Sequence, residues 1–252
     1  MLLQRICLTL RYDGTRYHGW QVQKNAVTVQ ALLQDAIEAV TGVRSDVTGC
    51  SRTDAGVHAR MFCCAFETES ALRGEKLAAA LNAHLPSDVA VYACRETENS
   101  FHPRYDAKGK RYIYRIWNGS VRNPFEAAYA WHRNRPLQEE LLDKAARLFV
   151  GTHDFAAFQA AGSSVKDTVR TVYECRVERH GDMVEFVVVA NGFLYNMVRI
   201  MVGTLMAVAD GKLQAEDIRA ILVSGKREQA GPTAPPHGLF LDRVYYSEEE
   251  ML

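Results

Sequence analysis

The sequence contains no long apolar segment and no closely spaced cysteine pair. Among its 252 residues, no apolar run approaches the roughly 20 residues that a helix needs to cross a bilayer. The opening stretch MLLQRICLTLRYDG carries Arg5 within its apolar part and has no small-residue cleavage site, so we expect no secretory signal peptide. The six cysteines never occur in C-x-x-C spacing. We therefore expect reduced, mostly buried thiols in a cytoplasmic protein.

The short motifs that bind nucleotides and metal ions are absent as well. Neither the phosphate-binding pattern G-x-x-x-x-G-K-S/T nor the dinucleotide-binding pattern G-x-G-x-x-G occurs. The eight histidines never adopt H-x-x-x-H spacing with neighbouring acids, and Ser51 has no nucleophile-elbow context. We expect no cofactor and no bound metal.

Neither sign of charge is in excess. Lys and Arg together number 30, and so do Asp and Glu, which gives a formal net charge of +0. The overall field of such a chain does not steer an anionic partner, so any nucleic-acid site must be a local patch. The remaining composition, with 48% hydrophobic and 24% charged residues, is typical of a globular protein with a sizeable core.

Apolar residues in the first part of the chain alternate along predicted strands and recur at helical spacing between them. Ile6, Leu8 and Leu10 alternate, which indicates a strand. The segment TVQALLQDAIEAVTG has its apolar residues at helical spacing and a glycine at its end. The predicted order is strand, helix, strand, helix, strand, over residues 4–13, 28–42, 61–68, 74–86 and 88–96.

The same kind of pattern begins again near residue 108. The predicted elements are a strand at 108–119, a helix at 137–151, a hairpin at 169–190 with its turn at His180-Gly181-Asp182, a buried helix at 192–211, a short helix at 215–223 and a last strand at 238–246. We predict an α+β fold of two similar halves on a ferredoxin-like plan, divided into residues 1–105 and 106–252.

The segment GCSRTDAGVHAR, residues 49–60, places one carboxylate among several cations. Thr-Asp-Ala-Gly is also ordinary turn chemistry, in which the Asp54 carboxylate bonds backbone amides and Gly56 takes a positive φ. A turn alone does not require Arg52 and His58. A carboxylate beside a guanidinium stays ionised, which suits a nucleophile or an electrostatic stabiliser better than a proton donor. From this segment alone, the structural and the catalytic interpretations both stay open.

Basic and aromatic residues are interleaved in FHPRYDAKGKRYIYR, residues 101–115. The cations are Arg104, Lys108, Lys110, Arg111 and Arg115, and the tyrosines are Tyr105, Tyr112 and Tyr114. Only one acid, Asp106, stands among them. Such a mixture suits phosphates and unstacked bases. The alternative is an edge strand on which Lys and Arg block unwanted pairing.

Arg199 lies within the predicted buried helix, in the segment NGFLYNMVRIMVG. Its immediate neighbours are apolar, so its guanidinium either extends to the edge of the helix or is buried against a carboxylate. Burial without a partner would cost too much free energy. Asp54 is the evident partner, and a surface glutamate is the alternative.

These segments together resemble the TruA family of tRNA pseudouridine synthases. GCSRTDAGVHA is similar to the catalytic motif of that family, and RYDGTRYHGWQVQ, FHPRYDAKGKRYIYRI, FLYNMVRIMVG and HGLFLDRVYY match it in the same order. The resemblance covers residues 5–246. Ser51 departs from the glycine that many members carry, and its small side chain is compatible with activity.

The resemblance implies a role for each of five residues. Asp54 would be the nucleophile, and Arg199 would hold it in an ion pair. Tyr112 would stack on the target base and help to move a proton. Leu239 would pack against the uracil, and Arg52 would help to displace the base from its stack. Further tRNA contacts would come from His58, Arg104, Lys110 and Arg111.

The resemblance also implies the architecture, the substrate and the assembly. The two halves would form one continuous, mostly antiparallel sheet with helices packed on it and a central active-site cleft. The substrate would be uridine at positions thirty-eight, thirty-nine and forty in the anticodon stem-loop of tRNA, isomerised to pseudouridine. The enzyme would be a homodimer that needs no cofactor, metal or membrane.

Two other classes of protein remain open from the residues alone. A non-catalytic RNA-binding protein would use the basic segment, but it would have no use for an Asp54–Arg199 pair, since a carboxylate weakens RNA affinity. A hydrolase with an aspartate nucleophile would normally need a second carboxylate, and the motif segments offer none beside Asp54.

Overall fold

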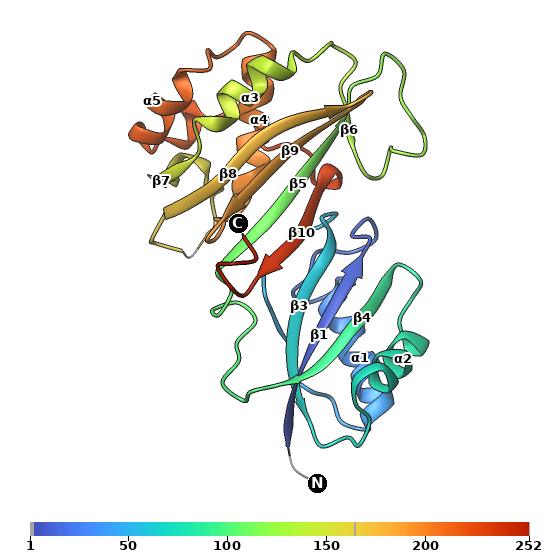
Figure 1. Ribbon diagram of the computed structural model, residues 1–252. Coiled ribbons are helices and arrows are strands. Elements are labelled where there is room, and N and C mark those ends of the chain that lie inside the picture. Colours follow the sequence, from blue (N-terminus) through green and yellow to red (C-terminus); the bar gives the residue numbers. More distant parts are fainter. Residues whose placement is uncertain (1–2, 164, 252) are drawn as a thin grey trace. The chain divides into compact units, whose positions relative to one another are not determined.

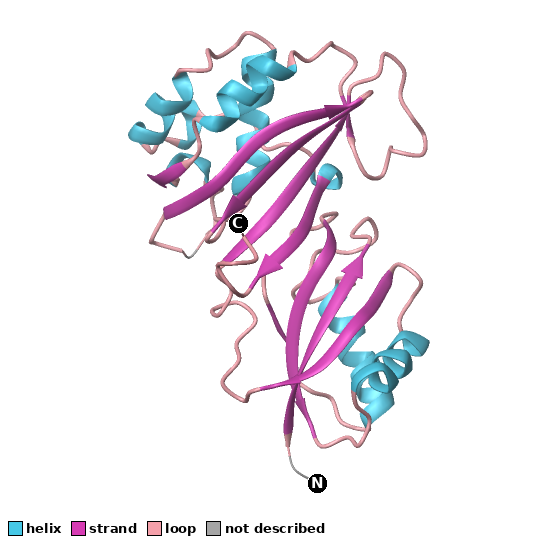
Figure 2. Ribbon diagram, viewed as in Figure 1, coloured by secondary structure: helices cyan, strands magenta, loops and turns pink. Residues whose placement is uncertain are grey.

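The computed structural model describes residues 3–163 and 165–251, which divide into two compact units. The first unit runs to Lys108 and also includes the chain from Leu241 onward, and the second unit is Gly109–Phe240. The described residues form ten strands and five α-helices, with mostly antiparallel pairing, so the predicted α+β class is confirmed (Figure 2).

In the first unit, three long strands form the sheet. β1 (Gln4–Tyr12) lies between β3 (His58–Thr68) and β4 (Val89–Thr97) and pairs with both in antiparallel fashion. The two-residue β2 (Thr48–Gly49) also pairs with β3. The last strand, β10 (Leu239–Tyr245), enters this unit at Leu241 and follows β3 in the strand order.

Helices α1 (Val29–Thr41) and α2 (Gly74–His84) belong to the first unit (Figure 1). α1 begins where the Thr28 side chain accepts a hydrogen bond from the Ala31 amide, and it ends at Gly42, whose φ is 77°. Residues one helical turn apart on α1 are buried, as are alternate residues of β1. The core of the first unit therefore contains the helix and strand faces that the sequence pattern predicts.

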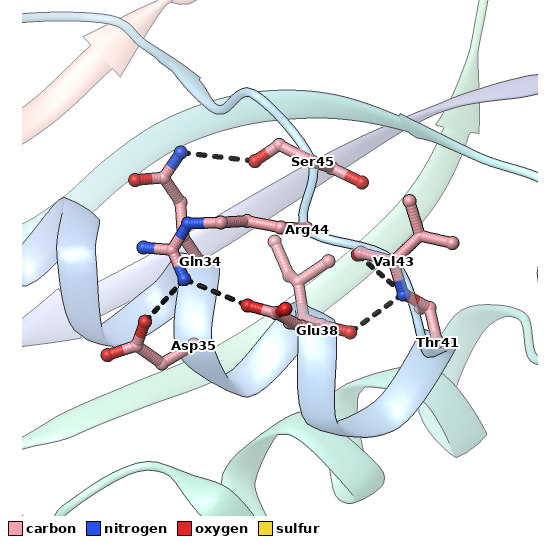
Figure 3. Close-up of polar contacts among 8 residues, drawn as sticks. Gln34, Asp35, Glu38, Thr41, Val43, Arg44 and Ser45 are labelled. Carbon is pink, nitrogen blue, oxygen red and sulfur yellow. Dashed lines mark hydrogen bonds and ion pairs between the residues drawn. The ribbon is translucent and has the colours of Figure 1, made fainter.

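Two acids on α1 hold the chain that leaves this helix. Figure 3 shows the Arg44 guanidinium between two carboxylates, with Nη1 2.6 Å from Asp35 Oδ1 and 2.9 Å from Glu38 Oε2. Gln34 Nε2 donates to the Ser45 carbonyl at 3.1 Å. The Arg44 side chain is about half exposed, so each of these ion pairs contributes little to the stability of the fold.

In the second unit, four strands pair in antiparallel fashion in the order β5-β9-β8-β7. Its long strands are β5 (Gly109–Trp117), β8 (Val169–His180) and β9 (Met183–Ala190), and its short ones are β6 (Trp131–His132) and β7 (Gly151–Asp154). β6 pairs with β5 in parallel fashion. The predicted hairpin is confirmed, because β8 and β9 are joined at Gly181, whose φ is 61°.

Helices α3 (Glu139–Arg147), α4 (Met197–Ala209) and α5 (Asp217–Ser224) complete the second unit. α4 is buried along nearly its whole length, as predicted from its apolar sequence. The predicted start at residue 192 is wrong, because Asn196 adopts a left-handed φ of 59° and the helix begins only at Met197. No helix of the described residues is both long and apolar enough to cross a membrane.

Candidate active site

In the first unit, Asp54 lies in the loop between β2 and β3. The Val57 amide donates to the Asp54 carbonyl at 3.1 Å, and Gly56 takes a φ of 76°, as the turn interpretation predicts. Asp54 is half-buried, whereas Arg52 beside it is exposed. The loop thus carries a half-buried carboxylate and, two residues before it, an exposed guanidinium on a tightly turned backbone.

The loop after β1 holds the Asp54 loop through its backbone. The Trp20 amide donates to the Thr53 carbonyl at 3.1 Å, and the Gly56 amide donates to the Tyr17 carbonyl at 3.2 Å. Gly19 lies so close that an added Cβ would be 2.3 Å from the Thr53 carbonyl oxygen and 3.0 Å from the Asp54 carbonyl carbon. Only glycine fits there, because its φ of 84° is also left-handed.

Two buried side chains add to this support. The Tyr12 hydroxyl is 2.8 Å from Thr53 Oγ1, and both residues are buried. His58 is 1% exposed, and its Nδ1 accepts a hydrogen bond from the Gly14 amide at 3.0 Å. Neither Tyr12 nor Thr53 is among the site residues predicted from the sequence. Their position within the RYDG and SRTD segments was the only signal for them.

His58 also lies close to an acid. Its Nδ1 is 3.1 Å from Asp13 Oδ1, an oxygen that also accepts a hydrogen bond from the Thr15 amide at 2.9 Å. This predicted site residue is therefore built into the packing between the two loops. Arg60, two positions further along β3, is 3.1 Å from Asp242 of β10.

The basic segment is divided between the two units. Arg104 and Lys108, in the first unit, are exposed. In the second unit, Lys110 is only 8% exposed, and Arg111 is half-buried on β5 opposite Val189. The described structure therefore presents two of these four cations to solvent and holds the other two within a strand.

Tyr112 lies on β5 of the second unit, opposite Val188 of β9. Its ring makes an edge contact with Phe193, with centroids 4.9 Å apart and an interplanar angle of 78°. Phe193 belongs to the turn before α4, so the Tyr112 ring is oriented by the segment that leads to Arg199.

Arg199 lies in the first turns of α4 and is held by two contacts within the second unit. Its Nε donates to the Ala234 carbonyl at 2.7 Å, and its Nη1 donates to Asn196 Oδ1 at 2.6 Å. The Ala234 amide donates in turn to the Arg199 carbonyl at 3.1 Å. The side chain is half-buried, so these bonds fix the direction of its guanidinium.

The segment bonded to Arg199 leads directly to Leu239. It passes through a 3-10 turn, Pro236–Gly238, and Leu239 then begins β10 with 6% of its surface exposed. The Tyr114 hydroxyl donates to the Pro235 carbonyl at 2.7 Å, and burial raises the pKa of Tyr114 above its ordinary value. The second unit thus connects Arg199 and Leu239 through one hydrogen-bonded segment.

The predicted site residues fall into two groups. The first unit holds Arg52 and Asp54 on the loop before β3 and His58 at the start of β3, and the second unit holds Tyr112, Arg199 and Leu239. Each group has its own set of supporting hydrogen bonds.

One group of described residues has the geometry to hold a metal ion. Single ligand atoms of Glu178, His180 and Glu185 lie within 4.8 Å of one another. Both carboxylates already have guanidinium partners, with Glu178 3.2 Å from Arg176 and Glu185 3.3 Å from Arg115. The cations that neutralise this cluster are therefore protein side chains.

Comparison with known proteins gives consistent matches. The model of the tRNA pseudouridine synthase family matches residues 9–106 and 145–247. A tRNA pseudouridine synthase A from Thermoanaerobacter sp. (strain X514) is 49% identical over 244 residues, covering 97% of this chain and 100% of that protein. The protein of the same name from Acetivibrio thermocellus is 46% identical over the same shares.

A solved structure, "Crystal Structure of a Cbf5-Nop10-Gar1 Complex", contains a similar chain with a TM-score of 0.41 and 13% identity. The match covers 96% of this chain and 60% of that chain, a similarity too low to support an argument.

The chain thus has an α+β fold and a loop in which hydrogen bonds support Asp54. It is also similar over nearly its full length to proteins that share one name, tRNA pseudouridine synthase A. The chain belongs to the tRNA pseudouridine synthase family. This family isomerises uridine to pseudouridine in tRNA, so its members are isomerases.

Proposed function

We propose that this protein converts uridine to pseudouridine at positions thirty-eight, thirty-nine and forty in the anticodon stem-loop of tRNA, with Asp54 as the nucleophile. The observation that carries the proposal is the Asp54 loop itself. Two backbone hydrogen bonds hold the loop, from the Trp20 amide to the Thr53 carbonyl and from the Gly56 amide to the Tyr17 carbonyl. Asp54 is half-buried on this loop, and Arg52 is exposed. Membership of the tRNA pseudouridine synthase family supplies the reaction.

The isomerisation balances without any co-reactant. The bond between uracil N1 and the ribose breaks, and a bond between C5 of the same uracil and the ribose forms. C5 loses its hydrogen to solvent, and N1 gains one. Asp54 attacks the uracil ring or the ribose, and either route detaches the uracil so that it can rotate and rejoin through carbon. No cofactor or metal takes part in this scheme.

The other residues receive roles that follow the same chemistry. A uridine within a stem must leave its stack before reaction, and we assign Arg52 to the space that the base vacates. Tyr112 stacks on the flipped base and Leu239 packs against it. We assign Arg199 as the ion-pair partner that keeps the Asp54 carboxylate ionised.

The remaining residues are proposed as contacts of the tRNA backbone. Arg104 is exposed and available to a phosphate, and Arg111 is half-buried. His58 and Lys110 are 1% and 8% exposed, so a direct contact from either would need its surroundings to open. We further propose that the protein acts as a homodimer in the cytoplasm, where its six free thiols would stay reduced.

The test uses purified protein and unmodified tRNA labelled with tritium at C5 of uridine. The expected result is release of tritium to water and pseudouridine at the three positions, with loss of product at each position whose uridine is replaced by cytidine. Free uracil as the product would identify a hydrolase. Binding without any release of tritium would identify an RNA-binding protein and contradict the proposal.

A further inference from the structure

The loop that follows β4 holds one aromatic ring out in solvent. Tyr105 is 77% exposed, and its ring is stacked on that of His102, with centroids 4.1 Å apart and an interplanar angle of 28°. A single exposed aromatic residue is normally unremarkable on a protein surface. This one differs because a second ring supports one of its faces.

Hydrogen bonds within the loop fix the supporting ring. His102 Nδ1 accepts from the Arg104 amide and from the Tyr105 amide, both at 3.1 Å. The His102 amide donates to Asp106 Oδ2 at 2.8 Å, and the Asp106 amide donates to the His102 carbonyl at 3.0 Å. Since Nδ1 is an acceptor, the ring carries its hydrogen on Nε2 and has a single orientation.

The loop is also attached to the sheet of the first unit at several points. The Tyr246 hydroxyl donates to the Pro103 carbonyl at 2.9 Å, and the Arg5 Nε donates to the Phe101 carbonyl at 2.7 Å. The Lys108 amide donates to the Tyr245 carbonyl at 2.8 Å. Folding therefore orders the loop in advance, so a ligand that binds to Tyr105 does not bear that entropic cost.

Cations stand on both sides of the exposed ring in the sequence. Arg104 and Lys108 are both exposed. Asp106, the one acid among residues 101–115, accepts a hydrogen bond from the His102 amide. An open aromatic face with adjacent cations matches the alternation of base and phosphate in single-stranded nucleic acid.

We propose that Tyr105, backed by His102, is a stacking platform for an unpaired base of the tRNA, with Arg104 and Lys108 contacting the neighbouring phosphates. The platform is a binding contact in addition to those of the Asp54 loop. It rests on the proposed function, since that function supplies tRNA as the ligand. Stacking accepts any base, so the platform distinguishes unpaired from paired nucleotides and is insensitive to sequence.

The test compares Tyr105→Ala with Tyr105→Phe, which keeps the ring. Dissociation constants are measured for unmodified tRNA and for a fully paired RNA duplex over a range of salt concentrations. Stacking on an aromatic residue is worth about 1–3 kcal/mol per base, so Tyr105→Ala should weaken tRNA binding by roughly 5-fold to 150-fold. Tyr105→Phe should stay within about twofold of wild type, and duplex binding should be the same in all three proteins.

Two controls separate stacking from other effects. Tyr173→Ala removes an exposed tyrosine of the second unit and should leave tRNA binding unchanged. Arg104→Ala should reduce the slope of log affinity against log salt by about 0.7–0.9, whereas Tyr105→Ala should leave that slope unchanged. Because Tyr105 is largely exposed, the variants should melt at the wild-type temperature, and Tyr105→Leu, which keeps apolar bulk without a ring, should bind as weakly as Tyr105→Ala.

Wild-type affinity in Tyr105→Ala would overturn the platform, and so would an equal loss for the duplex or a weakening shared by Tyr105→Phe. These outcomes are independent of the proposed function. If the protein forms pseudouridine but Tyr105→Ala binds tRNA like wild type, only the proposed stacking platform is rejected. If tRNA binding depends on Tyr105 but the protein forms no pseudouridine, only the proposed reaction is rejected.

Discussion

The hydrogen bond between Tyr12 and Thr53 acts on the residue next to the proposed nucleophile. Tyr12→Phe keeps the ring and removes the hydroxyl, which lies 2.8 Å from Thr53 Oγ1. One neutral hydrogen bond is worth about 1 kcal/mol, so we expect kcat to fall by about fivefold with KM unchanged. Thr53→Val should lower kcat to the same extent. Thr53→Ser, which keeps the hydroxyl, should retain wild-type kcat. A change confined to KM or to the melting temperature would assign the bond a structural role only.

A comparison of two glycines with similar left-handed φ values distinguishes the effect of close packing from the effect of backbone strain. Gly19 and Gly42 have φ values of 84° and 77°, but an added Cβ meets the Thr53 carbonyl only at Gly19 and meets nothing within 4 Å at Gly42. Gly42→Ala should cost about 1–2 kcal/mol of unfolding free energy and leave kcat intact. Gly19→Ala should cost more and reduce kcat at least tenfold, because the backbone of Asp54 must move. Equal kcat values for the two variants would contradict this account.

At the residue scale, the sequence draws attention to residue types that are unusual for their surroundings. Asp54 among cations and Arg199 among apolar residues both stand out in the sequence. Tyr12 and Thr53 do not, because a tyrosine at the end of a strand and a threonine before a turn are ordinary residues. Their significance comes from a contact between residues that lie 41 positions apart, which no local pattern contains.

At the scale of elements, Arg199 links α4 to the segment that leads to Leu239. Arg199→Met keeps the apolar stem and removes the hydrogen bonds to the Ala234 carbonyl and to Asn196. We expect kcat to fall by roughly 100-fold, as when one fixed donor is lost from an active site. Unfolding free energy should change by about 1–3 kcal/mol at most. Arg199→Lys should remain impaired, since an ammonium group cannot reproduce the planar fork. Wild-type turnover in Arg199→Met would exclude Arg199 from the site.

The loop after β1 should make stability sensitive to alkaline pH. Burial, followed by the hydrogen bond to the Asp88 carboxylate, raises the pKa of Tyr17 to about 12. An unfolded tyrosine loses its proton near pH 10, so between about pH 10 and 12 only the folded state retains it. The stability that Tyr17 contributes is therefore present below about pH 10 and is lost as the pH rises toward 12. Urea unfolding of Tyr17→Phe should show a shallower decline over this window, and an identical decline would contradict the assignment.

The elements that the sequence predicted are the long ones with a clear period. β1 was predicted from the alternation of its apolar residues, and the β8–β9 hairpin was predicted from two strand patterns around a turn. β2 and β6 contain only two residues each and carry no period. The start of α4 was misplaced because apolar residues continue before it, and only the backbone shows the left-handed Asn196 that delays the helix.

At the scale of the whole molecule, the sequence gives no sign that its last strand leaves the second half. The chain from Leu241 onward belongs to the first unit, and the Arg60–Asp242 contact joins residues 182 positions apart. A boundary placed at one point of the sequence cannot assign this last segment of the chain to the first unit.

The central claim is that the Asp54 carboxylate performs the chemistry. The direct measurement is pseudouridine formed in unmodified tRNA by purified Asp54→Asn, together with the dissociation constant of the same variant. The amide is nearly isosteric but a far poorer nucleophile, so we expect no product and binding within several-fold of wild type. Asp46→Asn, which changes an exposed carboxylate of the same unit, should retain full activity. Substantial product from Asp54→Asn would contradict the account.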